Sequence, residues 1–109
     1  MDFEITPDQV KRKLDSGEAL TIIDVREPVE LQMASLKGAS VKHIPMGDLP
    51  ARAHQELDPD AHIVVICHHG VRSANVTMWL RNEGYDRAQS MRGGIDLWSK
   101  TVDPSVPVY

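Results

Sequence analysis

Two short segments of the chain consist almost entirely of apolar residues and are rich in valine and isoleucine. They are residues 20–25 (LTIIDV) and residues 62–67 (HIVVIC). Continuous apolar runs of this length are typical of strands that are buried on both faces of a parallel sheet. Weaker strand candidates cover residues 3–5, 40–43 and 88–90.

Helix signals alternate with these strands. Thr6 is a suitable N-cap, Pro7 fits the first helical position, Gln9 completes a capping box, and Gly17 marks the end of that helix. Four further helices are expected. A short one opens at Pro28, and another runs from Asp48 and Pro50 towards Leu57. The longest runs from Gly70 or Val71 to Gly84, and the last begins near Gly94 and buries Ile95, Leu97 or Trp98. Such alternation predicts an α/β fold with a parallel sheet covered on both faces. Residues 102–109 contain two prolines and are expected to be extended.

Length, charge and cysteine content restrict the possible classes of function. A chain of 109 residues is predicted to form one domain, residues 1–109. Its net charge of −4 argues against a nucleic acid or an anionic membrane as a partner. The start of the chain lacks the basic residues of a signal peptide, and the apolar runs are far shorter than the roughly 20 residues of a membrane span. A lone cysteine cannot form an internal disulfide, so we expect a reducing, cytoplasmic environment.

The candidate chemistry lies where the second strong strand ends. Cys67 closes that strand, His68, His69, Gly70, Val71 and Arg72 follow it, and Ser73 falls in the first turn of the next helix. Ligand sites of open parallel sheets lie at the carboxyl ends of strands. A cysteine there faces the free amides and the positive dipole end of a helix, although it could also be a buried small hydrophobe.

The helix dipole alone is too weak to ionise a thiol fully. A free cysteine is only a few per cent thiolate at neutral pH, and reversing that ratio needs roughly 2.7 kcal/mol. A helix dipole contributes about 0.3–1 kcal/mol, and about 2 kcal/mol in favourable geometry. The remainder is expected from loop amides aimed at the sulfur and from the charge of Arg72, with Gly70 allowing the tight turn.

Three segments together resemble the rhodanese family. They are Asp24-Val25-Arg26-Glu27-Pro28 with Glu30, the loop Cys67-His68-His69-Gly70-Val71-Arg72-Ser73, and Arg92-Gly93-Gly94-Ile95-Asp96-Leu97-Trp98. The resemblance covers nearly the whole chain and implies a three-layer α/β/α domain with a five-stranded parallel sheet. The chain departs from the family after Glu30, where Ala34-Ser35-Leu36 replaces the usual Gly-His-Ile. This change suggests a helix end without a left-handed residue.

The resemblance also implies a sulfurtransferase without a cofactor. Cys67 would take sulfane sulfur from a donor such as thiosulfate and pass it, as a persulfide, to cyanide, a thiol or a protein acceptor. The loop residues 68–73 would bind the substrate and the persulfide. Arg72 would stabilise the loop and the anion, with a surface salt bridge as the alternative role for this side chain. The family has an acid at the position of Asp24 that hydrogen-bonds near the site, although a plain strand-end carboxylate is an equal alternative here.

The roles of several side chains near the loop have more than one interpretation from the sequence. Arg26 and Glu30 are expected to form an ion pair with each other. Ser73 fits an N-cap-like residue or a hydroxyl donor to the sulfur, and the two roles are compatible. No metal is expected at His68 and His69, because no third ligand follows at a suitable spacing; protonation of these rings could instead make the activity depend on pH. Trp79 and Trp98 are expected in the core.

Other functions compete with sulfur transfer. A persulfide carrier or interaction module would use the same Cys67 without efficient turnover. A cysteine phosphatase is disfavoured, because the related phosphatases place five residues between cysteine and arginine and this chain has four. A redox or arsenate-handling protein would need an external thiol, since the chain has no second cysteine.

Overall fold

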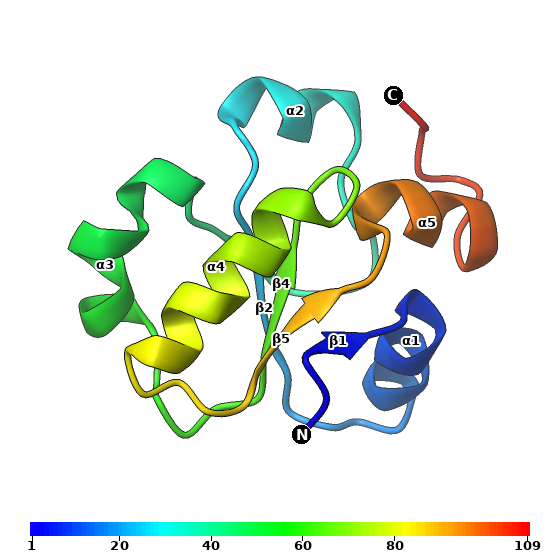
Figure 1. Ribbon diagram of the computed structural model, residues 1–109. Coiled ribbons are helices and arrows are strands. Elements are labelled where there is room, and N and C mark those ends of the chain that lie inside the picture. The colour runs from blue at the N-terminus through cyan, green and yellow to red at the C-terminus, as the bar shows by residue number, and fades with distance from the viewer.

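The computed structural model describes residues 1–109 and has one parallel sheet with helices on both faces (Figure 1). The sheet has five strands in the order β1-β5-β4-β2-β3, and the pairings are all parallel. The strands are β1 (Glu4–Ile5), β2 (Thr21–Asp24), β3 (Val41–His43), β4 (Ile63–Ile66) and β5 (Ala88–Met91). The α/β class and the five predicted strands are therefore confirmed.

Helices alternate with the strands along the chain. They are α1 (Pro7–Asp15), α2 (Pro28–Met33), α3 (Leu49–Glu56), α4 (Val71–Asn82) and α5 (Gly94–Thr101), with a 3₁₀ turn, η1 (Met46–Asp48), before α3. The capping box predicted for the first helix is present, with the Thr6 hydroxyl accepting from the Gln9 amide. Helix α2 ends in the extended residue Ala34, as the replaced glycine suggested.

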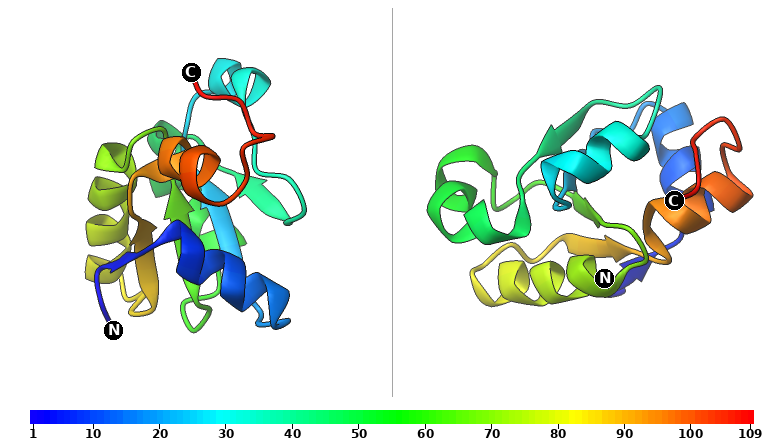
Figure 2. Two further views of the ribbon diagram at one scale, coloured as in Figure 1. Left: turned by 90° about the vertical axis from the view of Figure 1, so that its right-hand side faces the viewer. Right: turned by 90° about the horizontal axis from the view of Figure 1, so that it is seen from above.

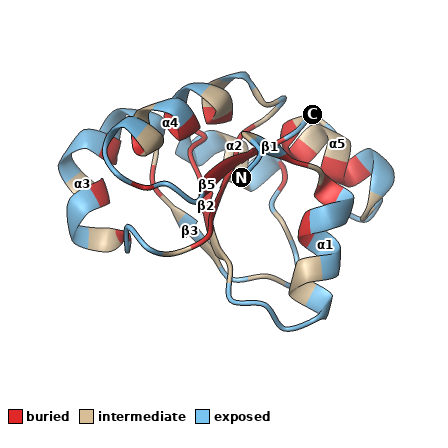
Figure 3. Cartoon of the chain, turned by 60° about the horizontal axis from the view of Figure 1, so that its bottom comes forward, coloured by how far each residue is buried: buried red, intermediate tan, exposed pale blue.

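The alternation of side chains along β2 and β4 divides the core in two. Ile23, Ile63 and Val65 face α3 and α4, whereas Ile22 and Val64 face α1 and α5. Buried residues accordingly line both faces of the sheet in Figure 3. Helix α2 buries none of its own residues and lies above the carboxyl ends of the strands in Figure 1.

The two tryptophans differ in burial. Trp98 is 2 % exposed and belongs to the core on the α1 and α5 side, as predicted. Trp79 is only partly buried: it packs against the other core and lines a shallow apolar hollow with Met46 and Leu49.

The prediction of an extended segment at residues 102–109 is wrong. The Val106 amide bonds the Asp103 carbonyl at 3.1 Å, and the Ser105 amide bonds the Asp103 carboxylate at 3.1 Å. These bonds fold the segment into a turn, because Asp-Pro-Ser is a strong turn sequence. The segment then runs back from α5 towards α2 (Figure 2), so that Tyr109 reaches the carboxyl ends of the strands. In the whole structure, none of the helices has the length and apolar character that crossing a membrane requires.

Candidate active site

Cys67 follows the last residue of β4 and is 1 % exposed. It continues the β4 alternation of Ile63 and Val65 and so contributes to the core beside α4. Its sulfur is nevertheless not in purely apolar surroundings. The amide of Gly70 donates to Sγ at 3.0 Å and that of Ser73 at 3.3 Å. Two main-chain donors therefore converge on one sulfur atom, an arrangement that favours a negative charge there.

Gly70 allows the loop to turn its amides inward. Its φ of +106° lies in the left-handed region, and it is the N-cap of α4. A Cβ on Gly70 would also lie 3.2 Å from the amide nitrogen of Gly93. Both the backbone conformation and the close approach of the second loop thus require glycine here.

The segment that begins α5 is fastened to this loop. The amide of Ile95 donates to the carbonyl of Cys67 at 2.9 Å, and that of Asp96 to the carbonyl of His68 at 3.1 Å. A Cβ on Gly94 would lie 2.5 Å from the Cys67 oxygen, and Gly94 has a φ of +61°. The Gly-Gly pair found in the sequence therefore has a structural reason: it brings α5 into main-chain contact with the cysteine loop.

Ser73 contacts the sulfur through its side chain as well as its amide. The Cys67 thiol lies 3.3 Å from Ser73 Oγ, which also bonds Ser90 Oγ at 2.8 Å and donates to the Gly70 carbonyl at 3.2 Å. The N-cap-like role is wrong, because Gly70 is the N-cap and Ser73 lies in the first turn. The Ser73 hydroxyl does lie next to the sulfur, but between these two groups the thiol is the donor, and the hydroxyl proton goes to the Gly70 carbonyl.

The predicted ion pair between Arg26 and Glu30 is wrong. Glu30 instead pairs with Arg72, whose Nη1 and Nη2 each lie 2.8 Å from one carboxylate oxygen. Arg26 contacts Glu30 only through the main chain, since its Nη1 donates to the Glu30 carbonyl at 3.2 Å. The Arg72 guanidinium lowers the pKa of the Glu30 carboxyl to about 2. The pair ties α2 to the first turn of α4.

Arg26 has Asp24 as its partner. Its Nη2 lies 2.7 Å from Asp24 Oδ2 and 2.8 Å from the Ala34 carbonyl, and both side chains are almost fully buried. Burial acts against the charge of Arg26, but the bonds to Asp24 and Tyr109 raise its pKa overall. Asp24 therefore fixes the buried side chain of Arg26 through an ion pair, and this contact of Asp24 is a structural one.

Tyr109 is a site residue that sequence analysis missed. Its hydroxyl donates to Glu30 Oε1 at 3.0 Å and accepts from Arg26 Nη1 at 2.9 Å. Its ring stacks on His68 with centroids 3.7 Å apart and planes 4° from parallel. Burial raises the pKa of the phenol. Nothing local marks residue 109, since its contacts depend on the turn at residues 103–106.

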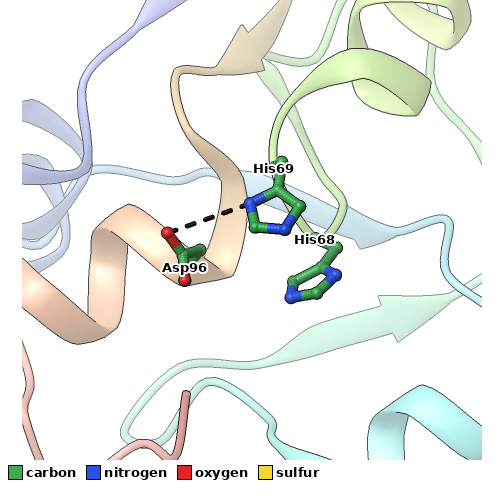
Figure 4. Close-up of side chains that lie close together, drawn as sticks. All are labelled: His68, His69 and Asp96. Atoms are coloured by element: carbon green, nitrogen blue, oxygen red, sulfur yellow. Dashed lines mark ion pairs between the residues drawn. The ribbon is translucent and has the colours of Figure 1, made fainter. Parts of the chain in front are cut away.

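His68 and His69 meet an unexpected acid. Their rings stack with centroids 3.8 Å apart, and Nδ1 of His69 lies 3.8 Å from Asp96 Oδ2 (Figure 4). One nitrogen or oxygen of each of these three residues lies within 4.8 Å of the others. Sequence spacing did not show this acid as a potential third ligand, because α5 supplies Asp96 across the fold.

The fold and the loop together define a class of protein: an α/β domain with a buried cysteine at the carboxyl end of a central parallel strand, facing the amides of a short loop. Comparison with known proteins agrees. The family model described as Rhodanese-like domain matches residues 6–101. The chain therefore belongs to the rhodanese-like domain family.

Individual relatives extend this result. The Putative sulfurtransferase YtwF of Bacillus subtilis is 36 % identical over 101 residues, which cover 93 % of this chain and 94 % of that protein. The Putative sulfur carrier protein YrkF of the same organism is also 36 % identical, over 88 % of this chain and 50 % of its own length. Other relatives are longer still, and the chain spans 26 % to 30 % of them.

A solved structure shows the same fold. The rhodanese-related protein of Thermoplasma volcanium superposes with a TM-score of 0.82 at 30 % identity, covering 99 % of this chain and 100 % of that one. The likeness extends over the whole sheet and its helices, so the predicted five-stranded rhodanese-like architecture is confirmed.

Proposed function

We propose that this protein is a sulfurtransferase that moves sulfane sulfur through a persulfide on Cys67. The observation that carries the proposal is the pair of amides, from Gly70 and Ser73, that donate to Sγ at 3.0 and 3.3 Å. Preorganised amides stabilise a negative charge without a metal or an organic cofactor. The names of the similar proteins, one a putative sulfurtransferase and one a putative sulfur carrier, support sulfur chemistry in general.

The first step takes sulfur from an anionic donor such as thiosulfate. The Cys67 thiolate attacks the outer sulfur of the donor and forms a new S–S bond. The old S–S bond of thiosulfate breaks, and its electron pair leaves with sulfite. The product carries its negative charge on the outer sulfur of the persulfide, close to the loop amides.

The second step passes the sulfur on. A thiophilic acceptor such as cyanide, a small thiol or a protein thiolate attacks the outer sulfur and forms a bond to it. The persulfide S–S bond breaks, and its electron pair returns to Cys67 as the thiolate. No net oxidant or reductant is needed, because the outer sulfur changes partners by displacement.

The size of the loop separates this reaction from phosphoryl transfer. Four residues lie between Cys67 and Arg72, and only two amides bond the sulfur. In addition, both terminal nitrogens of Arg72 already hold Glu30. A phosphoryl group needs donors for three oxygens, so one sulfur is the better match to this loop.

Intact-mass measurement after incubation with thiosulfate tests the proposal. The wild-type protein is expected to gain one sulfur atom, and Cys67→Ser is expected to gain none. Loss of the added sulfur on treatment with cyanide, with formation of thiocyanate, would complete the cycle. A wild-type protein whose mass does not change with any sulfane donor would contradict the persulfide step.

Turnover separates an enzyme from a carrier. Repeated formation of thiocyanate per protein molecule indicates an enzyme, whereas a single sulfur released only to one partner protein indicates a carrier. Hydrolysis of an aryl phosphate without gain of sulfur would favour the phosphatase alternative.

A further inference from the structure

We propose that His68, His69 and Asp96 form a binding site for a divalent metal of borderline softness, such as Zn²⁺, beside the cysteine loop. Two imidazoles and one carboxylate are a ligand set that such ions take in proteins, with a fourth position left for water or a substrate. The ligands come from two elements that the fold fastens together, since the Asp96 amide bonds the His68 carbonyl at 3.1 Å. The site does not depend on the proposed sulfur transfer.

The distances between the ligand atoms suit a metal ion. Tetrahedral zinc with bonds of about 2.0–2.2 Å places its ligand atoms roughly 3.4 Å apart. Nδ1 of His69 lies 3.8 Å from Oδ2 of Asp96, too far for a hydrogen bond but within a few tenths of that spacing. One ligand atom of each residue lies within 4.8 Å of the others, so side-chain rotation without movement of the main chain can bring three ligand atoms to one ion.

One of the two ring nitrogens of His68 already has a main-chain partner. Its Nε2 lies 2.6 Å from the main-chain oxygen of Tyr109. Because that oxygen can only accept, Nε2 is the donor of this bond, which leaves Nδ1 as the nitrogen for a metal. Histidine ligands in metal sites commonly donate their second ring nitrogen to a main-chain oxygen in this way. Stacking on Tyr109 further restrains the ring.

The other two ligands can adjust at little cost. A metal lies in the plane of an imidazole that binds it, so the stacked His69 ring has to rotate; its side chain is 60 % exposed and free to do so. Asp96 also bonds Lys100 at 2.9 Å, but Lys100 is exposed and such surface pairs contribute about 0–1 kcal/mol. The Lys100 ammonium lowers the pKa of the Asp96 carboxyl, which is therefore ionised at neutral pH.

The arginines near the loop carry no unpaired positive charge that would repel a cation. Arg72 is paired with Glu30 and Arg26 with Asp24, so neither arginine has an unshared charge. A bound dication would place unpaired positive charge beside the cysteine loop. That charge would attract the anionic sulfur donors of the proposed function.

Titration calorimetry with ZnCl₂ tests the site, with Cys67→Ser as the background so that the thiol cannot bind zinc. This variant is also inactive in the proposed transfer, so the result is independent of that function. We expect one ion per chain, and binding at least about 10-fold weaker in the further variants His69→Gln and Asp96→Asn, a loss that corresponds to about 1.4 kcal/mol. Mg²⁺, which prefers oxygen ligands, is expected to bind much more weakly.

His54→Gln is the matched control, because His54 is another exposed histidine beside an acid, 3.2 Å from Glu83, without a second histidine. It is expected to leave zinc affinity unchanged. Thermal unfolding with and without Zn²⁺ gives a second readout, since a ligand of the folded state raises Tm. Absence of saturable binding, or equal binding in His54→Gln, His69→Gln and Asp96→Asn, would overturn the proposal.

Discussion

The Ser73 hydroxyl lies 3.3 Å from the Cys67 sulfur and 2.8 Å from the Ser90 hydroxyl, in a fully buried position. When the sulfur is a thiolate it can only accept, so the Ser73 hydroxyl then has an anionic partner. Ser90 lies on β5 and fixes that hydroxyl from behind. The sulfur thus has two amide donors, and the Ser73 hydroxyl becomes a third only when its proton turns from the Gly70 carbonyl to the thiolate.

Replacing Ser73 with alanine should slow persulfide formation more than it unfolds the protein. Hydrogen bonds to charged groups contribute about 1.5–3 kcal/mol, which corresponds to roughly 10-fold or more in the rate with thiosulfate. Intact-mass measurement of samples quenched at successive times, at subsaturating thiosulfate, gives this rate. Ser99→Ala is the control, because Ser99 is an equally buried serine on α5 that bonds only the Pro107 carbonyl. Equal rates in both variants would remove the hydroxyl from the proposed mechanism.

The lowered pKa of the Glu30 carboxyl predicts that the free energy of unfolding depends on pH. Its pKa is about 2 in the folded protein, against an ordinary value of 4.5, because Arg72 holds it ionised. A lowered pKa means that the unfolded chain takes up the proton first, so this stabilisation is present above about pH 4.5 and is lost as pH falls towards 2.

Glu30→Gln should therefore lower the free energy of unfolding by about 1–3 kcal/mol at pH 7, and the difference from the wild type should shrink between pH 4.5 and 2. Urea unfolding at several pH values measures this. Glu18→Gln, which removes only the exposed pair with Lys13, should have little effect at any of them. A Glu30→Gln deficit that stayed constant down to pH 2 would contradict the lowered pKa.

At the scale of elements, the contact between the start of α5 and the cysteine loop depends on Gly94. Two amides of α5 bond the carbonyls of Cys67 and His68, and a side chain at position 94 would collide with those oxygens. The close approach and the left-handed backbone are separate requirements. A comparison of two glycines can distinguish them.

Gly94→Ala is expected to be much more destabilising than Gly17→Ala. Both positions have a positive φ, so each variant bears a strain of about 1–2 kcal/mol. Position 17 has open space for the new Cβ, whereas position 94 adds the collision with main-chain oxygens, which cannot rotate away. Tm and urea midpoints measure the difference. Equal losses in the two variants would mean that the loop accommodates the added carbon.

Sequence reasoning found the elements because their signals are local. Apolar runs gave β2 and β4, and the Thr6-Pro7-Gln9 capping box gave the start of α1. The same reasoning placed Cys67 at a strand end, because strand and helix boundaries fix that position along the chain. It found the cysteine loop, but the inward turn of its amides became visible only with the φ of Gly70.

It failed where a partner comes from a distant part of the chain. Of the two partners that replace the expected ion pair, Arg72 is 42 residues from Glu30 and is brought in by α4. Asp24 is only two residues from Arg26, so this second pair is local and was missed for another reason: the strand-end acid was considered only as a contact near the site. Asp96 reaches the histidine pair only through the main-chain bonds of α5, and Tyr109 reaches His68 only after the turn at 103–106. No local periodicity or spacing carries such information.

At the scale of the whole molecule, the carboxyl ends of the strands gather groups from both ends of the sequence. Asp24 ends β2 and Arg26 follows it, Glu30 lies on α2, and Arg72 lies in the first turn of α4. Tyr109 contacts Arg26 and Glu30 from the other end of the chain. These groups form one continuous series of bonds in which the Tyr109 hydroxyl joins Arg26 to Glu30. The segment that carries Tyr109 therefore helps to hold α2 against the cysteine loop.

Tyr109→Phe tests that connection, because it removes the hydroxyl and keeps the ring that stacks on His68. Two bonds to charged partners are lost, so the free energy of unfolding should fall by about 1–3 kcal/mol. Hydrogen exchange of the amides of residues 28–34 and 67–73 should accelerate, since α2 and the loop lose a shared support. Tyr85→Phe is the control: its hydroxyl bonds His54 at 3.2 Å on the α3 side and touches neither segment. If both variants changed exchange in these two segments equally, Tyr109 would be a stabilising contact without a particular link to the site. If only Tyr109→Phe accelerated exchange in residues 28–34 and 67–73, the segment 102–109 would support the geometry around Cys67.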